Sequence, residues 1–314
     1  MVTTTETSRI KGVLSPVVTP FDSQLRPDTK RLIRHCRWLL DQDVGLALFG
    51  TNSEANSLGL AEKRALLDSM VEAELPPARM MPGTGCSALT ESVELTRHAV
   101  KAGCGGVLML PPFYYKGVSD EGLYRNFSEI IQRVGDESLR IYLYHIPPVS
   151  QVAITLPLIE RLIKAYPGTI AGVKDSSGIW DNTKTMLDLF QPHGFDVFAG
   201  SETYLLQTLR NGGAGCISAT ANVNPGAIAR LARTWQEADA ELQQQALDVV
   251  RSTFAKFPMI PALKTAIAEF SDDSEWAIVR PPLVELDAAQ RPALVDAMRA
   301  IDFSMTNLKE SVLR

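Results

Sequence analysis

The stretch RIYLYHIPPVSQVAITLPLIERLIKAYPGTIAGVKDS (residues 140–176) contains two short apolar runs on either side of a segment with helical periodicity. The runs at 141–145 and 170–173 are apolar almost throughout, as is typical of parallel strands buried on both faces. Between them, Thr155 is suited to cap a helix. Four apolar residues recur on one face of that helix: Leu158, Ile159, Leu162 and Ile163. The stretch therefore predicts a β-α-β unit.

The same alternation of strand and helix extends over most of the chain. Eight apolar runs predict strands, and they begin near Gly12, Gly45, Met80, Gly106, Arg140, Ile170, Asp196 and Gly215. Successive runs start roughly 20–35 residues apart, which is about the size of one β-α unit. We therefore expect an α/β fold of the (β/α)8 TIM-barrel type with a small C-terminal helical extension. A doubly wound open sheet is the alternative.

Three segments are predicted along the chain: a polar N-terminal tail (1–10), the barrel (11–235) and a C-terminal helical domain (236–314). The strand signals stop after Ala221. From there to about Met305 the pattern is helical.

Composition excludes several classes of function. The 314 residues carry a net charge of −5, so a nucleic-acid partner is not expected. No apolar run approaches the ~18 residues that a membrane helix needs. The four cysteines form no C-x-x-C pair, and their spacing indicates neither a zinc site nor a disulfide framework. We expect a cytoplasmic protein that binds neither membrane nor nucleic acid.

In a barrel of this type, the active site lies at the C-terminal ends of the strands. The polar residues expected there are Thr19, Thr51, Asn52, Ser53, Glu54, Thr84, Tyr114, Tyr115, Tyr144, His145, Lys174, Asp175, Ser176, Ser201 and Glu202. Histidine spacings typical of metal sites are absent, as are phosphate-binding glycine loops. We therefore expect no metal and no organic cofactor.

Lys174 is the strongest candidate for a catalytic residue, because it follows an apolar strand that should lie inside the barrel. Burial disfavours the ammonium form, and a neutral amine can attack a carbonyl to form a Schiff base. A structural ion pair with Asp175 or Glu54 is the alternative. Tyr144 ends the neighbouring strand, where a phenol could shuttle protons or simply pack at the rim.

The turn Gly50–Glu54 is rich in hydrogen-bond donors. Successive backbone N–H groups and the side chains beside them could hold a carboxylate. Capping of the following helix is the alternative.

Taken together, these residues resemble the dihydrodipicolinate synthase / N-acetylneuraminate lyase family of class I, Schiff-base aldolases, over about residues 12–300. The resemblance rests on the order and spacing of Val17-Val-Thr-Pro-Phe21, Gly50-Thr-Asn-Ser-Glu54, Pro111-Pro-Phe-Tyr-Tyr115, Tyr144-His-Ile-Pro147 and Gly172-Val-Lys-Asp-Ser-Ser-Gly178. It implies a barrel with a C-terminal helical domain, a homotetramer built as a dimer of dimers, and chemistry without a cofactor.

The resemblance also implies catalytic roles. Lys174 matches the lysine that forms an imine with pyruvate or another 2-keto acid, and Tyr144 matches the tyrosine that relays protons. Thr51 matches a further member of this relay. Tyr114, or its neighbour Tyr115, matches a tyrosine that reaches the site of a neighbouring subunit.

Other matches concern substrate binding. Thr51 and Asn52 match the pair that binds the keto-acid carboxylate. Ser176 matches a hydroxyl that touches substrate in the lyases. Gly200 matches a glycine whose backbone faces the substrate, and Ile217 matches an apolar residue lining the pyruvate pocket.

Departures from the family pattern bear on the substrate. The synthases carry an arginine five residues after the catalytic tyrosine, where this chain has Val149, which cannot clamp a carboxylate. His145 replaces the usual asparagine and adds a group that can titrate. Of the acidic pair that the sialic-acid lyases carry, only Glu202 remains, and it is expected to contact a polyol. Ala219 replaces a serine of those lyases.

The sequence predicts a lyase that reversibly cleaves a 4-hydroxy-2-keto acid to pyruvate and an aldehyde. Two alternatives use the same lysine imine: a 4-hydroxy-tetrahydrodipicolinate synthase and a 2-keto-3-deoxy sugar acid dehydratase. Two others do not: an idle keto-acid-binding protein, and a metal-dependent barrel enzyme with Glu54, Asp175 and His145 as ligands.

Overall fold

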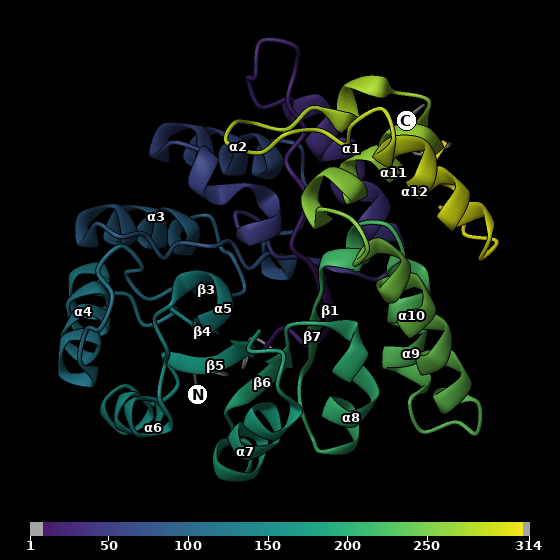
Figure 1. Cartoon of the computed structure of the whole chain (residues 1–314). Coiled ribbons are helices and arrows are strands. Elements are labelled where there is room, and N and C mark those ends of the chain that lie inside the picture. The colour runs from purple at the N-terminus through teal and green to yellow at the C-terminus, as the bar shows by residue number, and fades with distance from the viewer. Residues whose placement is uncertain (1–8, 310–314) are drawn as a thin grey trace.

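A computed structural model describes residues 9–309, so most of the predicted N-terminal tail lies outside the described residues. These residues form an α/β fold with one parallel sheet of seven strands, in the order β2-β1-β7-β6-β5-β4-β3. Helices surround this sheet (Figure 1). The strands are β1 (Gly12–Ser15), β2 (Gly45–Leu46), β3 (Val107–Met109), β4 (Ile141–His145), β5 (Ile170–Asp175), β6 (Asp196–Ala199) and β7 (Gly215–Ile217).

The predicted strand near Met80 is the exception to the expected eight. Residues 80–84 form only isolated parallel bridges, from Met80 to Leu46 in β2 and from Gly83 to Leu108 in β3. Pro82 has no N–H to donate, which limits regular pairing, although its carbonyl accepts from the Leu108 N–H at 2.9 Å. The segment nevertheless joins the two edge strands of the sheet.

Helices follow the strands in the predicted alternation. The predicted cap is confirmed, since Thr155 Oγ1 accepts from the Leu158 N–H at the start of α6. No helix within residues 9–309 has the length and hydropathy to cross a membrane. The helices are α1 (Thr29–Asp41), α2 (Leu60–Glu72), α3 (Leu89–Lys101), α4 (Asp120–Val134), α5 (Pro147–Ser150), α6 (Leu156–Ala165), α7 (Trp180–Phe190), α8 (Leu205–Arg210), α9 (Pro225–Thr234), α10 (Ala240–Phe254), α11 (Met259–Ser271) and α12 (Gln290–Arg299).

The strands are buried on both faces, which explains their continuous apolar character. Outside them, side chains of the helices and strands form one large apolar cluster. Inside, side chains from successive strands form a second, smaller cluster that includes Leu14, Leu108, Tyr142, Tyr144, Phe198 and Ile217. The interior of the sheet is therefore packed with side chains.

Candidate active site

Lys174 and Tyr144 lie side by side on neighbouring parallel strands. The two residues are register partners in β5 and β4. Lys174 Nζ lies 4.3 Å from the centroid of the Tyr144 ring, and both side chains are almost fully buried. Gly172 explains why an aromatic strand fits beside β5, because a Cβ there would lie 2.7 Å from the Tyr142 ring.

No ion pair formed by the described residues involves Lys174. Glu54 instead pairs with Lys264 at 2.7 Å. Asp175 accepts hydrogen bonds from the Thr183 hydroxyl at 2.6 Å and from Asn182 Nδ2 at 3.0 Å. The structure therefore gives no support to the alternative that Lys174 serves a structural ion pair.

Thr51 reaches Tyr144 from the turn that follows β2. Its Oγ1 lies 3.1 Å from the Tyr144 Oη, within hydrogen-bond distance. The short 3-10 helix Thr51–Ser53 forms this turn. Ser53 fixes it, because its Oγ accepts from the Gly50 N–H at 3.2 Å and its carbonyl accepts from Thr19 Oγ1 at 2.7 Å. Ser53 is thus a structural residue, and Thr51 can pass a proton to or from the phenol.

A cavity of about 300 Å³ lies at these strand ends. Its lining includes six of the nine predicted site residues: Thr51, Asn52, Tyr144, Lys174, Ser176 and Gly200. Gly200 permits the close approach of β6 to β5, because a Cβ there would clash with Ser176 Oγ and lie 2.7 Å from the Asp175 carbonyl oxygen. The cavity therefore combines a buried amine with several neutral hydrogen-bonding groups.

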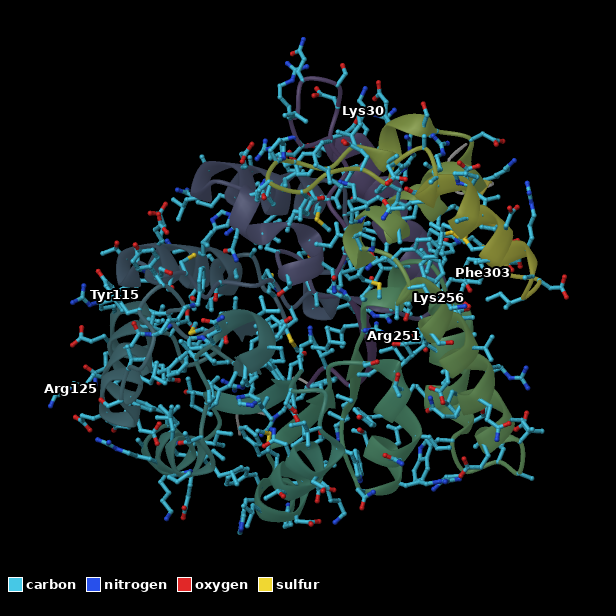
Figure 2. All side chains as sticks on the ribbon, viewed as in Figure 1. Lys30, Tyr115, Arg125, Arg251, Lys256 and Phe303 are labelled. Carbon is cyan, nitrogen blue, oxygen red and sulfur yellow. The ribbon has the colours of Figure 1, made fainter. Side chains whose placement is uncertain are left out.

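Three predicted site residues lie elsewhere. Ile217 is fully buried in the inner core cluster and does not line the cavity. Tyr114 is 74% exposed and packs edge to face against Tyr115. Figure 2 shows Tyr115 at the outer side of the molecule near α3 and α4. Neither tyrosine touches the Tyr144–Thr51 pair within one chain.

Glu202 is the third predicted site residue that lies outside the cavity. Its side chain is 1% exposed and is absent from the cavity lining. Its carboxylate oxygens accept hydrogen bonds from the hydroxyls of Ser218 and Thr220. Both oxygens are thus engaged inside the protein, and the contact of Glu202 with a polyol remains a prediction.

The three ligands named for the metal alternative, Glu54, Asp175 and His145, do not form a metal site in the described residues. His145 Nδ1 accepts from the Ile154 N–H at 3.0 Å, and burial lowers the pKa of this imidazole while the Asp175 charge opposes that shift. Glu54 is held by Lys264. Within residues 9–309, no three His, Cys, Asp or Glu side chains are grouped closely enough to hold a metal ion.

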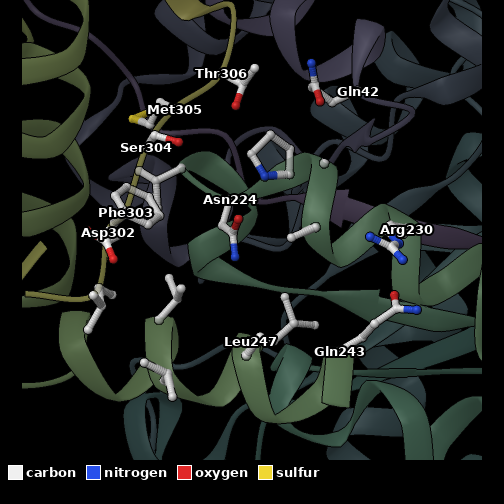
Figure 3. A pocket seen from close by; sticks show the side chains of 18 of the residues that line it. Gln42, Asn224, Arg230, Gln243, Leu247, Asp302, Phe303, Ser304, Met305 and Thr306 are labelled. Carbon is white, nitrogen blue, oxygen red and sulfur yellow. The ribbon is translucent and has the colours of Figure 1, made fainter. Parts of the chain in front are cut away.

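A larger cavity, of about 840 Å³, lies between α9, α10 and residues 301–306 (Figure 3). Asn224, Arg230, Gln243 and Asp302 are among the polar residues that line it. It contains none of the predicted site residues and no amine like that of Lys174. Chemistry, and not size, therefore identifies the smaller cavity as the candidate active site.

Sequence reasoning missed the cavity residues that come from the C-terminal helices. Arg251 projects from α10 and Met259 begins α11, and both line the cavity with Tyr204. Arg251 and Met259 lie far from every strand end in the sequence. No local pattern separates Arg251 from the exposed arginines of other helices, so a folded structure was needed to find it.

With this geometry described, comparison with known proteins identifies the family. The model of the dihydrodipicolinate synthetase family matches residues 9–301. The chain belongs to this family. Its members include lyases and synthases. The family assignment that the motifs suggested is therefore confirmed.

Relatives match over nearly their full length. An "uncharacterized DapA-like lyase" of Chloroflexus aurantiacus is 33% identical over 298 residues, which is 93% of this chain and 97% of the relative. A protein of Rhizobium meliloti named 4-hydroxy-tetrahydrodipicolinate synthase is 30% identical, over 92% of this chain and 97% of its own.

Solved structures of the family have the same fold. Dihydrodipicolinate synthase from Agrobacterium tumefaciens superposes with a TM-score of 0.83 at 32% identity, covering 92% of this chain and 99% of that chain. YagE, a prophage protein of this family from E. coli K12 solved in complex with pyruvate, gives a TM-score of 0.85 at 26% identity, over 95% of this chain and 100% of its own.

Proposed function

We propose that this protein is a Schiff-base lyase that reversibly cleaves a 4-hydroxy-2-keto acid to pyruvate and an aldehyde. The observation that carries the proposal is the Lys174 amine, buried without a carboxylate partner beside the hydrogen-bonded Tyr144–Thr51 pair. An amine held beside a phenol that can donate or accept a proton is suited to carbonyl chemistry, because it can attack a carbonyl carbon to form a Schiff base.

The first half of the reaction forms the imine. Thr51 and Asn52 hold the substrate carboxylate by hydrogen bonds. The Lys174 amine attacks the C2 carbonyl carbon and loses a proton, and the carbonyl oxygen becomes the hydroxyl of a carbinolamine. Tyr144 protonates this hydroxyl, which leaves as water. The product is a protonated imine, and Tyr144 is left as a phenolate that accepts a hydrogen bond from the Thr51 hydroxyl.

The second half breaks the carbon–carbon bond. Tyr144 takes the proton of the C4 hydroxyl, the C3–C4 electron pair moves toward the imine nitrogen, and the C4 fragment leaves as an aldehyde. The enamine left on Lys174 takes a proton at C3 from Tyr144, whose phenolate then accepts a proton from the attacking water. Water then hydrolyses the imine and releases pyruvate. The lysine nitrogen acts as the electron sink throughout, so the reaction requires no metal or organic cofactor.

A second candidate is a 4-hydroxy-tetrahydrodipicolinate synthase, which several relatives are named as. Val149 disfavours it, because this apolar residue lines the cavity where the synthases present an arginine. The third candidate is a 2-keto-3-deoxy sugar acid dehydratase, in which the substrate, bound as the same imine, loses water.

The assembly is also part of the proposal. We propose a closed (β/α)8 barrel over residues 11–235, with residues 80–84 in place of the eighth strand, and a helical domain from residue 236. We further propose a cytoplasmic homotetramer, in which Tyr114 or Tyr115 contacts the site of a neighbouring subunit. The exposure of both tyrosines supports this arrangement.

A substrate panel tests the function. Purified protein is incubated with 4-hydroxy-2-keto acids and, separately, with 2-keto-3-deoxy sugar acids or with pyruvate and aspartate semialdehyde. We expect pyruvate to be released from at least one 4-hydroxy-2-keto acid. Water loss without pyruvate release would favour the dehydratase, and consumption of aspartate semialdehyde alone would favour the synthase.

A further inference from the structure

Arg251 is a cation of the candidate active site without a hydrogen-bonding partner. It projects from α10 into the lining of the cavity that contains Lys174. Its guanidinium makes no hydrogen bond to any residue in 9–309, and its Nη1 is fully buried. A buried donor without an acceptor costs free energy, so this group is poised for an acceptor that comes from outside the chain.

The nearest carboxylate does not meet this need. Glu202 Oε2 lies 3.9 Å from Arg251 Nη1, which is too far for a hydrogen bond. Both oxygens of Glu202 already accept from Ser218 and Thr220. Glu202 therefore offsets part of the guanidinium charge while leaving its N–H groups free.

The protein holds Arg251 in place through its helix. Gln244, which lies two turns earlier on the same face of α10, donates from Nε2 to the Glu202 carbonyl at 3.0 Å. Its Oε1 accepts from the Leu206 N–H at 3.1 Å. These bonds tie α10 to the segment that follows β6. In Figure 2, Arg251 accordingly lies on the inner side of α10, toward the strand ends.

Arg251 differs from the other charged side chains of the cavity, which are engaged elsewhere. Its lining contains three charged side chains: Lys174, Asp175 and Arg251. Asp175 is occupied by Thr183, Asn182 and the Ser177 N–H. Lys174 is consumed by the imine in the proposed function. Arg251 is thus the cation that remains available to a bound substrate.

We propose that Arg251 binds a second carboxylate, carried by the part of the substrate that leaves as the aldehyde. This inference rests on the proposed function and specifies its substrate class as 4-hydroxy-2-keto dicarboxylic acids. The planar guanidinium presents two parallel N–H groups, which match the two oxygens of a carboxylate. A phosphate dianion is disfavoured, because the site offers a single cation, Arg251, for its two negative charges. The Glu202 carboxylate, 3.9 Å from the guanidinium, would also repel the dianion.

Binding of two non-cleavable 2-keto acids tests the proposal without requiring turnover. 2-Oxoglutarate carries a terminal carboxylate, and 2-oxopentanoate has the same chain length without it. We expect 2-oxoglutarate to bind about 10- to 100-fold more tightly in calorimetric titration, the range for hydrogen bonds to a charged group. Arg251→Met should abolish most of this preference, and Arg251→Lys should retain part of it.

Lys256→Met is the matched control, because Lys256 is an exposed cation just beyond the end of α10. It should keep the wild-type preference. Equal binding of the two acids by the wild type would overturn the inference, as would a preference that survives in Arg251→Met. Thermal unfolding of each variant establishes that it is folded.

Failure of the proposed function has a different signature. Borohydride trapping of pyruvate on the wild-type protein reports imine formation alone. An adduct on Lys174 with no preference for 2-oxoglutarate would overturn only the assignment of Arg251. A preference for glyceraldehyde 3-phosphate over glyceraldehyde in aldol addition, without one for 2-oxoglutarate, would replace the carboxylate by a phosphate.

Discussion

Tyr142 and Tyr144 show how two residues of one strand acquire different chemistry. Both side chains point into the inner core, because residues at i and i+2 of a strand share a face. Tyr142 Oη donates to Asp196 at 3.2 Å, and burial raises the pKa of this phenol. Tyr144 Oη meets Thr51 at the strand ends instead. The position along the strand therefore decides which phenol can reach a substrate.

Tyr144→Phe should lower kcat about 10²- to 10⁴-fold, because it removes a group that transfers protons in both halves of the reaction. Steady-state pyruvate release measures this. Tyr142→Phe is the matched control on the same strand, and it should change kcat only slightly. Equal losses in the two variants would show that the effect is structural and would remove Tyr144 from its role.

For individual residues, part of the site could be predicted from the sequence. The pairing of Lys174 with Tyr144 follows from the strand pattern, since adjacent parallel strands end together. The internal hydrogen bonds of Glu202 could not be predicted, because its hydroxyl partners, Ser218 and Thr220, come from the segment that follows β7. Local sequence gives no information on such long-range hydrogen bonds.

Among the elements, α11 is tied to the turn after β2 by a fully buried ion pair. Lys264 Nζ lies 2.7 Å from Glu54 Oε1, and Glu54 Oε2 accepts from the Arg280 N–H at 2.9 Å. Burial lowers the pKa of Lys264 to about 8, although Glu54 opposes the shift. Glu54 directly follows the short helix of Thr51 and Asn52, so the C-terminal helices support the turn that faces the substrate.

Lys264→Met should destabilise the protein by about 3–5 kcal/mol, because it leaves Glu54 buried without a counter-charge. Urea denaturation measures the loss. The double variant Glu54→Gln/Lys264→Met should recover part of this stability, since neither charge then remains. A single variant as stable as the double one would contradict the interpretation.

The contact between α1 and the C-terminal segment contains a buried histidine. The His35 ring stacks on Trp38, meets Trp276 edge-on and lies 3.4 Å from Asn222 Oδ1 through Nε2. Burial lowers its pKa from 6.5 to about 4, although the contact with Asn222 opposes the shift. The native protein therefore keeps this ring neutral at pH values where the unfolded chain takes up a proton.

Acidification should accordingly weaken the fold. Below pH 6.5 the unfolded state binds the proton and the native state does not, so stability falls as the pH drops toward 4. His35 should contribute a loss of ~2 kcal/mol between pH 8 and pH 5. His35→Gln should reduce the pH dependence of the unfolding free energy by this amount. An unchanged dependence would contradict the assignment.

For the molecule as a whole, the arrangement of strands and helices was largely predictable, because burial on both faces produces long apolar runs. The run near Met80 was wrong as a regular strand, since Pro82 interrupts the pairing. Arg251 and Lys264 show the limit of prediction. Both come from helices that the sequence places in a separate extension, and only packing reveals that they reach the strand ends.

The proposed homotetramer can be tested by measuring the mass of the assembly. We expect a mass near four times the 34.4 kDa chain in light scattering. Replacing both exposed tyrosines, Tyr114 and Tyr115, by glutamate should dissociate the tetramer and lower activity, because it introduces charges into the proposed contact. Arg125→Glu, an exposed change on α4, serves as the control. A monomeric wild-type protein with full activity would contradict the proposed contact.

Borohydride reduction in the presence of pyruvate, followed by peptide mass spectrometry, tests whether Lys174 forms an imine with a 2-keto acid. We expect one reduced pyruvate adduct per chain, located on Lys174 and absent from Lys174→Ala. Lys264, which is equally buried but paired with Glu54, is an internal control and should remain unmodified. A folded protein that traps no pyruvate, or traps it on another lysine, would rule out Lys174 as the residue that forms the imine.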